Sequence, residues 1–407
     1  MADALAAFRM LLGENDAMAY LVNMAPRLVE LHRVLKSTGS LYLHCDPTMS
    51  HYLKILLDAI FGVKNFINEI SWHYNTGGAS KKTFSRKHDI ILFYAKSDES
   101  RIFFPQHEPF REDKTDHFNF TDEDGRKYRI RTINNKDYKY YLDEGRICHD
   151  VWEIDALNAY ATERLGYPTQ KPVALLERVI QASSEEGGVV LDPFCGCGTT
   201  VDAAIRTKRR WIGIDITYIA VDLINKRLRH TYGESILKQY DIVGIPADLE
   251  GAKALFGRSP FDFERWAVSL INAQPNEKQV GDKGVDGVGR FLVDTKSKVG
   301  RMLVSVKGGK TVGPQAVRDL IGTVDTQKAE MGVLLLMGEP TRGVLDAVAH
   351  AGSYTWPING QRFPRVQVLS VAQLIDGQRP QTPSLLLPYI QAARAVPPPA
   401  EQFTLEI

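Results

Sequence analysis

The chain has little cysteine and no long uncharged apolar stretch. Its four cysteines are Cys45, Cys148, Cys195 and Cys197. They are too few and too scattered for a disulfide framework or a zinc site with paired cysteines. No charge-free apolar run approaches the roughly 18 residues of a membrane span, and no secretion signal opens the sequence. These absences predict a protein of the reducing cytoplasm with no membrane segment.

Excess charge of either sign is also absent. Fifty Lys and Arg residues oppose 49 Asp and Glu residues, which gives a formal net charge of +1. Any affinity for a polyanion must therefore come from local patches. With 44% hydrophobic and 24% charged residues in 407 positions, the composition is that of a globular protein with two or three domains.

One stretch stands out in the second quarter of the chain. An apolar run at 189–191 stops at Asp192, and Gly196 and Gly198 follow within six positions. Such a run favours a buried parallel strand, and the glycines permit a tight turn that residues with a Cβ would strain. Thr199 suits the start of a helix, whose free N–H groups would point at a ligand.

A second strand follows at 211–214 and ends at another acid. Asp215 lies 23 positions after Asp192 (215 − 192), where nucleotide-binding folds place the acid that binds ribose hydroxyls. Taken without its flanking sequence, this strand–loop–helix–strand unit is also compatible with the turn of a NAD- or ATP-binding fold.

The string from Asp192 to Thr200 resembles the S-adenosylmethionine loop of DNA amino-methyltransferases, with Cys197 where that family usually has serine. Upstream, Tyr-Pro-Thr-Gln-Lys-Pro at 167–172 resembles the segment that precedes this loop in the β-group, which includes type III modification subunits. The resemblance implies a permuted, Rossmann-like α/β methyltransferase domain that binds S-adenosylmethionine. The residues it assigns to the cofactor are Asp192, Phe194, Gly196, Gly198, Thr199, Asp215, Gln170, Lys171 and Pro172.

The first hundred residues alternate between helical and strand patterns. Helical spacing at 14–36 and 51–61 flanks a strand at 40–45, and further strands are predicted at 65–72 and 89–95. This order resembles the part of the β-group that follows its catalytic motif. His44 and Asp46 are a candidate catalytic pair, although we favour strand-end residues that only line the cleft.

Two segments are candidates for DNA contact. The loop 80–88 holds four basic residues before its terminal histidine, which suits phosphates, and an ordinary solvated loop is equally compatible. Residues 101–166 hold eleven aromatic residues, eleven Lys or Arg and fourteen Asp or Glu. By resemblance, residues 98–166 form the target-recognition region. The alternative is that the aromatics form a small β-rich core.

The catalytic tetrad of the family, an Asp, Ser or Asn followed by Pro-Pro and an aromatic residue, is absent. The tetrad orients the target amine and stacks the flipped base, so methyl transfer should fail without it. In the family, its strand lies beside the cofactor-loop strand at the centre of the sheet. We therefore expect a truncated reading frame or a start upstream of Met1, and open strand edges where that strand is missing.

From about residue 261 a second α/β pattern begins. A helix, the string Gly-Val-Asp-Gly at 284–287 and a strand that ends in Val-Ser-Val-Lys at 304–307 resemble Mrr-like restriction endonuclease domains. The resemblance implies that Asp286 holds a divalent ion such as Mg²⁺, that Lys307 assists water attack, and that Glu264 completes the metal shell. Ser305 departs from the usual Glu or Gln, which predicts weak metal binding or a fold that binds DNA without cleavage.

The sequence thus predicts a DNA methyltransferase domain at 1–245, whose cofactor half is 167–245, an endonuclease-like domain at 246–380 and a tail at 381–407. The predicted function is methylation of double-stranded DNA, at adenine N6, in a restriction–modification system. A partner subunit or a homodimer is compatible with this prediction. The rival hypothesis is a catalytically inactive DNA-binding module or partner subunit.

Overall fold

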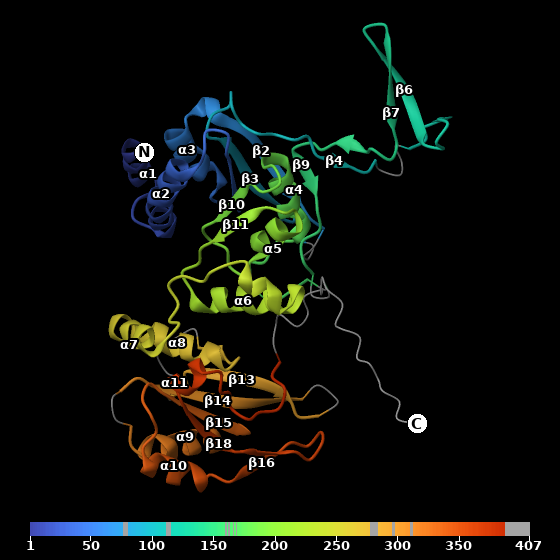
Figure 1. The fold of residues 1–407 in the computed structure, drawn as a ribbon. Helices are drawn as coiled ribbons and strands as arrows, with labels where there is room; N and C mark the ends of the chain where they lie inside the picture. The colour runs from blue at the N-terminus through green and yellow to red at the C-terminus, as the bar shows by residue number, and fades with distance from the viewer. Residues whose placement is uncertain are drawn as a thin grey trace, which may run out of the picture. The chain divides into compact units, whose positions relative to one another are not determined.

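A computed structural model describes residues 1–75, 80–110, 115–158, 161, 163–165, 167, 169–276, 284–294, 298–309 and 312–386. The chain divides into two compact units (Figure 1). Unit 1 comprises Met1–Ala161 and Thr169–Ile214, and unit 2 comprises Thr162–Pro168 and Asp215–Ile407. In the parts of the chain that the structure covers, no helix is both long and apolar enough to cross a lipid bilayer.

Unit 1 begins with helices around a four-stranded sheet. Its elements are α1 (Ala2–Leu12), α2 (Asp16–Val34), β1 (Ser40–Cys45), α3 (Ser50–Phe61), the 3₁₀ turn η1 (Val63–Asn65), β2 (Phe66–His73), β3 (His88–Ala95) and β9 (Val151–Glu153). The predicted helices and strands are confirmed within two residues, and α1 is an addition. The strand order is β1-β3-β2-β9, with β3 antiparallel to both of its neighbours.

Alternation along β3 explains the two layers of this unit. Ile90, Leu92 and Tyr94 are buried in one apolar cluster with α1, α2 and α3. Ile91 and Phe93 point to the opposite face and pack with Leu175 of helix α4 (Val173–Ser183). Successive side chains of a strand point to opposite faces. Strand β3 is therefore buried on both sides, with α1, α2 and α3 packed on one face of the sheet and α4 on the other.

A second, two-stranded sheet completes the core of unit 1. Strand β10 (Val189–Asp192) pairs in parallel with β11 (Arg210–Gly213), and helix α5 (Thr199–Arg206) connects them. Helix α4 packs against both sheets, since Leu176 contacts the apolar clusters of each. The predicted strand–loop–helix–strand unit is confirmed.

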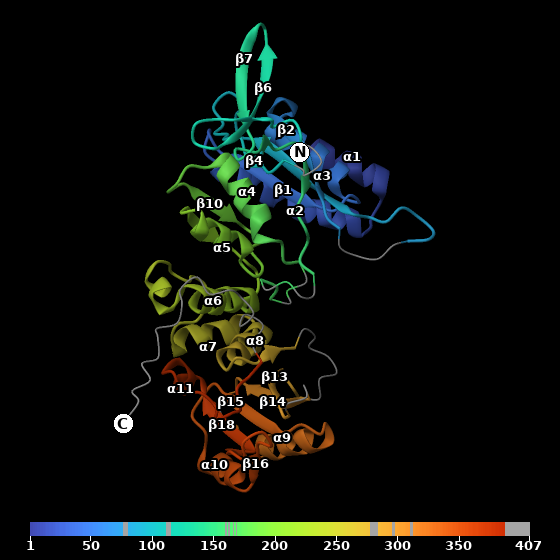
Figure 2. The same cartoon turned by 90° about the vertical axis from the view of Figure 1, so that its right-hand side faces the viewer.

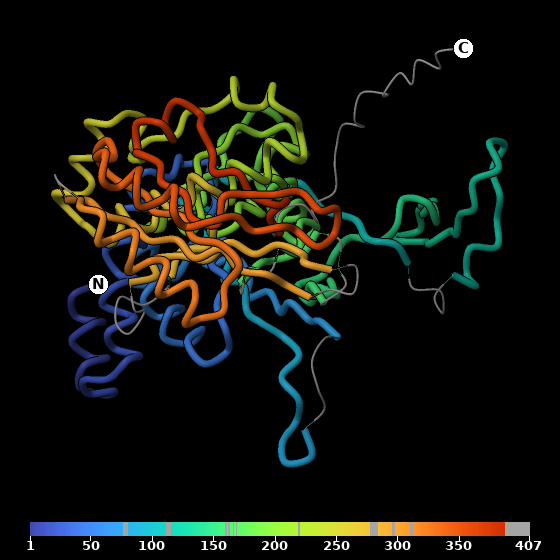
Figure 3. The backbone as a smooth tube through the Cα atoms, turned by 90° about the horizontal axis from the view of Figure 1, so that it is seen from below, coloured from blue at the N-terminus to red at the C-terminus, as the bar shows by residue number. Residues whose placement is uncertain are grey.

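The interval predicted to recognise the target forms small strands. They are β4 (His107–Glu108), β5 (Phe120–Thr121), β6 (Lys127–Ile133), β7 (Lys136–Tyr141) and β8 (Arg146–Ile147). Strands β6 and β7 form a hairpin that stands clear of the four-stranded sheet in Figures 2 and 3. Most of its residues are exposed, so the alternative of a packed aromatic core does not describe this hairpin.

Unit 2 holds a five-stranded mixed sheet in the order β12-β13-β14-β15-β18. The strands of this sheet are β12 (Gln274–Pro275), β13 (Gly287–Leu292), β14 (Val299–Lys307), β15 (Met331–Leu336) and β18 (Val366–Ser370). Strands β16 (Ser353–Thr355) and β17 (Arg362–Pro364) form a separate two-stranded sheet. The helices of unit 2 are α6 (Tyr218–Tyr232), η3 (Glu234–Lys238), α7 (Leu249–Arg258), α8 (Pro260–Leu270), α9 (Gln315–Thr326), α10 (Arg342–Ala349) and α11 (Val371–Ile375).

The division between the units falls earlier than the domain boundary predicted at residue 245. Helix α6 packs on α8 within unit 2, where Lys226 Nζ donates to the Ser269 carbonyl at 2.8 Å. Because α6 packs on α8, the compact units divide after Ile214, whereas the predicted cofactor half extends to residue 245. The boundary at residue 245 stays a prediction.

Candidate functional site

The loop after β10 is organised by the carboxylate of Asp192. Its Oδ1 accepts a hydrogen bond from the Phe194 N–H at 3.0 Å, and its Oδ2 accepts one from the Thr200 hydroxyl at 2.5 Å. One acid therefore ties the strand end to both the loop and the first turn of α5. Asp192 acts as a positioning residue for the turn, a role that the sequence alone did not separate from ligand contact.

Both loop glycines have backbone conformations that disfavour other residues. Gly196 and Gly198 have φ angles of 49° and 76°, which confirms the reason for their presence. The two loop cysteines are buried, and Cys197 Sγ lies 3.6 Å from the Thr199 hydroxyl. The thiol that replaces the family's serine therefore packs inward, beside the helix start.

An apolar cavity of about 310 Å³ lies beside this loop. Phe194, half exposed, lines it together with Leu31 and Val34 of α2. The other lining residues are Arg27, Glu30, Leu191, Pro193 and Ile214. The cavity thus lies between α2 and the end of β10.

The acid after β11 is held in a local turn. Asp215 Oδ1 accepts hydrogen bonds from the backbone N–H and the hydroxyl of Thr217, both at 2.9 Å. Thr217 in turn caps α6 by accepting from the Ala220 N–H. The residue before the acid, Ile214, accepts from the Cys195 N–H at 3.0 Å, which joins this strand end to the glycine loop.

The predicted Gln-Lys-Pro segment leads directly into α4, with Pro172 at the N-cap. Lys171 Nζ donates to the Thr169 carbonyl at 3.0 Å. Burial lowers the pKa of Lys171, while the charges of Asp89 and Cys197 oppose that shift. Lys171 thus lies within electrostatic reach of both the cofactor loop and the end of the large sheet.

The histidine at the end of β1 pairs with an acid that the sequence did not single out. His44 Nε2 lies 2.9 Å from Asp89 Oδ2 at the start of β3, and Tyr74 donates to the other oxygen at 3.3 Å. Asp46 instead accepts from Thr48 and from the Met49 N–H in its own turn. The structure therefore separates the suggested His44–Asp46 pair. The antiparallel register of β1 and β3 brings Asp89 diagonally opposite His44.

We expect Asp89→Asn to lower stability in a pH-dependent way. The hydrogen bond from His44 lowers the pKa of the Asp89 carboxyl. A lowered folded-state pKa contributes stability that is complete above the carboxyl's ordinary value and is lost as the pH falls through the lower value. Urea midpoints of parent and variant should differ at pH 7 and converge below about pH 4.

Tyr74→Phe is the matched control, since it removes a weaker hydrogen bond and keeps the carboxylate. The urea midpoint of Tyr74→Phe should lie closer to that of the parent, and the difference should change less with pH. An Asp89→Asn deficit that stays constant from pH 7 to pH 3 would show that packing, not charge, explains the effect.

The basic loop 80–88 is exposed along most of its length, and the side chain of Phe84 is fully exposed. Hydrogen bonds around Ser80 shape it: Ser80 Oγ accepts from the Lys82 and Thr83 N–H groups. This geometry is compatible with a phosphate-binding loop and with a solvated loop. The predicted phosphate contact stays a prediction.

The two sheets of unit 1 each present an open edge. Strand β1 pairs only with β3, and β10 pairs only with β11, among the described residues. Helix α4 packs on one side of both sheets, and α2 contributes to the core on the other side of β1 and to the cavity beside β10. On the exposed two-stranded sheet, Val189 and Ile212 are about half exposed (46% and 52%). Apolar strands with bare edges are unusual in a parallel α/β core.

In unit 2, the acid predicted to bind metal lies against the strand that carries the predicted lysine. Asp286 Oδ2 accepts from the Val306 N–H at 2.6 Å, and the Asp286 N–H donates to the Val304 carbonyl at 2.8 Å. Val306 precedes Lys307, so the structure brings both predicted residues to the same end of β14.

Glu264 lies on a helix that packs against the other face of the same strand. Helix α8 packs with Val304 and Val306, whereas Leu303 belongs to the apolar cluster of α9. By alternation, Ser305 and Lys307 share the α9 face. Within the described ranges, no group of three His, Cys, Asp or Glu residues could hold a metal ion. The role assigned to Glu264 stays a prediction.

Two family models match the chain. One, described as DNA methylase (N6_N4_Mtase), matches residues 8–226, which is more than half of the chain. The other, NACHT-associated inactive Restriction Endonuclease 1, matches residues 262–376. The second similarity covers all five strands of the larger sheet of unit 2.

Several curated bacterial proteins are similar to the methylase part. Type II methyltransferase M.EcaI of Enterobacter cloacae is 30% identical over 259 residues, 51% of this chain and 57% of the relative. Type II methyltransferase M.HpaI of Haemophilus parainfluenzae is 33% identical over 207 residues, 49% of this chain and 57% of the relative. DNA adenine methyltransferase YhdJ of Escherichia coli K12 is 32% identical over 199 residues, 48% of this chain and 63% of the relative. The chain spans about six tenths of the length of these relatives.

Among solved structures, the M1.HpyAVI–SAM complex aligns with a TM-score of 0.33 and 18% identity, over 51% of this chain and 82% of that one. The PvuII DNA methyltransferase, described as cytosine-N4-specific, aligns with a TM-score of 0.36 and 16% identity, over 52% and 72%. Both TM-scores are low.

Proposed function

The chain belongs to the DNA methylase family, and from that membership we propose that it is an S-adenosylmethionine-dependent amino-methyltransferase of double-stranded DNA in a restriction–modification system. Two of the reported relatives are named type II methyltransferases, and the third is named a DNA adenine methyltransferase, which supports adenine N6 as the target. Similarity to type III modification subunits stays a prediction.

The observation that carries this proposal is the loop after β10. Asp192 fixes the turn, two glycines adopt left-handed conformations, and α5 starts directly behind them. Backbone N–H groups at a helix start favour electronegative groups of a ligand. The loop therefore fits the polar amino-acid portion of the cofactor.

The apolar and acidic residues around the loop fit the rest of the cofactor. Phe194 is half exposed beside the loop, and its ring is suitable for packing against a base. Asp215 has a carboxylate suited to ribose hydroxyls, and the Lys171 side chain is bonded to Thr169 within its own segment. When bound, S-adenosylmethionine supplies an activated methyl group, while these side chains hold and orient it.

We expect Asp215→Ala to weaken cofactor binding about ten- to hundredfold. A charge-assisted hydrogen bond contributes roughly 1.5–3 kcal/mol, which corresponds to that range of affinity. Titration calorimetry with S-adenosylmethionine, on parent and variant chains, measures the loss.

Thr217→Ala is the matched control for that experiment. It removes the hydroxyl bonded to Asp215 and the N-cap of α6, but it keeps the carboxylate. Binding within about threefold of the parent is expected, because no direct ligand contact is lost. Tight binding by Asp215→Ala would disprove the ribose assignment.

The open edges support a further part of the proposal, namely that the active enzyme needs one more strand between β1 and β10. That strand would carry the absent Pro-Pro-aromatic tetrad. The support is the unpaired edges and the cavity between α2 and β10, not the position of Met1. We thus propose that this chain lacks one strand that the active enzyme has.

For unit 2 we propose a restriction-endonuclease-like domain, of the Mrr-like kind, with a weakened metal site. Asp286 and Lys307 lie at one end of β14, while buried Ser305 supplies a hydroxyl where a carboxylate would bind Mg²⁺. Similarity to a family described as inactive favours a domain that does not cleave DNA. A catalytically inactive binding module or partner subunit remains the competing function for the whole chain.

A further inference from the structure

The β6–β7 hairpin is an exposed ribbon with a regular register. Pairs run from Tyr128–Tyr141 to Ile133–Lys136, and the turn residues Asn134 and Asn135 have φ angles of 52° and 60°. Two successive left-handed residues are typical of the tight turn that closes a two-residue hairpin. The ribbon is therefore a defined two-stranded element rather than an irregular loop.

Charge is segregated between the two faces of this ribbon. Directly opposed residues of an antiparallel pair share a face, and successive residues alternate. One face, here called the basic face, carries four cationic residues and no acid. Its residues are Lys127, Arg129, Arg131, Ile133, Lys136, Tyr138 and Tyr140. The opposite face carries one cation, Lys139, and one acid, Asp137.

Three of the four cations of the basic face are presented to solvent. Lys127, Arg131 and Lys136 are exposed, and Tyr138 is 46% exposed between them. Arg129, nearer the base of the hairpin, stacks on Phe118 at 5.2 Å and on Tyr140 at 5.8 Å. Charges that merely keep exposed strands from aggregating need not gather on one face. Their segregation indicates a specific polyanionic partner.

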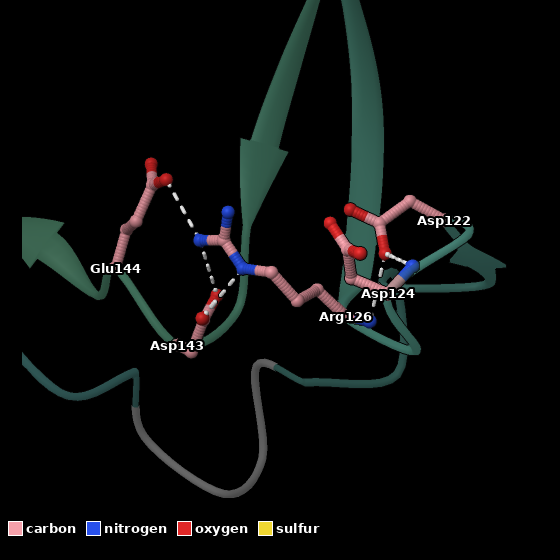
Figure 4. Close-up of polar contacts among 5 residues, drawn as sticks. All are labelled: Asp122, Asp124, Arg126, Asp143 and Glu144. Carbon is pink, nitrogen blue, oxygen red and sulfur yellow. Dashed lines mark hydrogen bonds and ion pairs between the residues drawn. The ribbon is translucent and has the colours of Figure 1, made fainter.

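Two acids near the ribbon pair with one arginine at its base (Figure 4). Arg126 donates two hydrogen bonds to Asp143, at 2.8 and 3.0 Å, and one to Glu144 at 2.9 Å. These bonds raise the pKa of Arg126, whose guanidinium also lies 3.9 Å from the Tyr141 ring centroid. Asp122 accepts from the Arg126 N–H at 2.9 Å. The base is thus cross-linked by ion pairs, and it orders the two strands.

We propose that the basic face of the β6–β7 ribbon enters the major groove of double-stranded DNA. That groove is about 12 Å wide and admits a two-stranded antiparallel ribbon. Lys127 and Lys136, near opposite ends of the face, contact phosphates. Arg131 and Tyr138, a directly opposed pair, reach base edges. The inference takes its partner, DNA, from the proposed function, but it can be tested without methyl transfer.

Binding of the full chain to a fluorescent 30-base-pair duplex of mixed sequence, followed by anisotropy, tests this assignment. Lys136→Gln and Lys139→Gln remove the same charge from the same strand on opposite faces. We expect Lys136→Gln to weaken binding and to reduce the slope of log affinity against log salt by about 1. Lys139→Gln should leave both unchanged. The double variant Arg131→Gln/Lys136→Gln should lose about tenfold or more.

Thermal melting and circular dichroism of each variant confirm that the exposed substitutions leave the fold intact. Equal DNA affinity and salt slope for Lys136→Gln and Lys139→Gln would overturn the proposal, as would a parent chain that binds no duplex. In either case an acidic protein surface would be the better partner for this face. Cofactor binding by the same samples shows separately whether the methyltransferase assignment holds.

Discussion

The chain should transfer no methyl groups to DNA above background, even when saturated with S-adenosylmethionine. The tetrad that orients the target amine is absent from the sequence, and the edges of β1 and β10 are unpaired in the described structure. Loss of one preorganised polar group typically lowers kcat about 10²–10³-fold. Loss of several at once should abolish measurable transfer.

Fusion of a strand that ends in Asp-Pro-Pro-Tyr, placed before Met1 through a flexible linker, should restore transfer of tritiated methyl groups to DNA. The same fusion ending in Ala-Pro-Pro-Ala is the matched control, because it can fill the gap without the reacting groups. Both fusions should raise thermal stability by covering apolar edges. Transfer by the unfused chain, abolished by Asp192→Ala, would show that another part of the chain supplies the catalytic groups.

The second large effect concerns unit 2. We expect plasmid cleavage by the parent chain with Mg²⁺ to be near the background level. Ser305→Glu should raise it about 10²-fold, since an added carboxylate ligand strengthens a metal site that can stabilise developing charge by several kcal/mol. Asp286→Ala or Lys307→Ala, combined with Ser305→Glu, should abolish this increase in cleavage.

Burial of Ser305, which is 4% exposed, means that Glu can disturb the packing. Ser305→Asp is the smaller second variant, and both are compared with the parent by thermal melting. EDTA controls establish metal dependence. If neither folded variant cleaves DNA while binding it, the weakened-nuclease assignment is wrong and the binding-module function stands for this unit.

The sequence predicted the cofactor loop well, because the determinants are local. An apolar strand, an acid and two glycines suffice to fix the turn, and the structure shows Gly196 and Gly198 in the left-handed region. The same holds for α2, whose apolar periodicity matches its burial, and for β14, whose continuous apolar run is buried on both faces. Local pattern and tertiary environment agree at these positions.

Non-local register was beyond the sequence. The partner of His44 is Asp89 rather than nearby Asp46, since only the pairing of β1 with β3 brings Asp89 close. The basic face of the β6–β7 ribbon could not be predicted from composition, because residues 101–166 as a whole hold more acidic than basic residues. Register assigns four of these cations to one face of the ribbon, and Arg126 pairs with Asp143 and Glu144 at its base.

The most direct measurement is equilibrium dialysis of the full chain against tritiated S-adenosylmethionine, with DNA added afterwards to the same sample. The central claim is a complete cofactor half without the strand that performs transfer. It predicts about one equivalent of bound cofactor and no label in DNA. A folded chain that binds no cofactor, or label that appears in DNA, would contradict it.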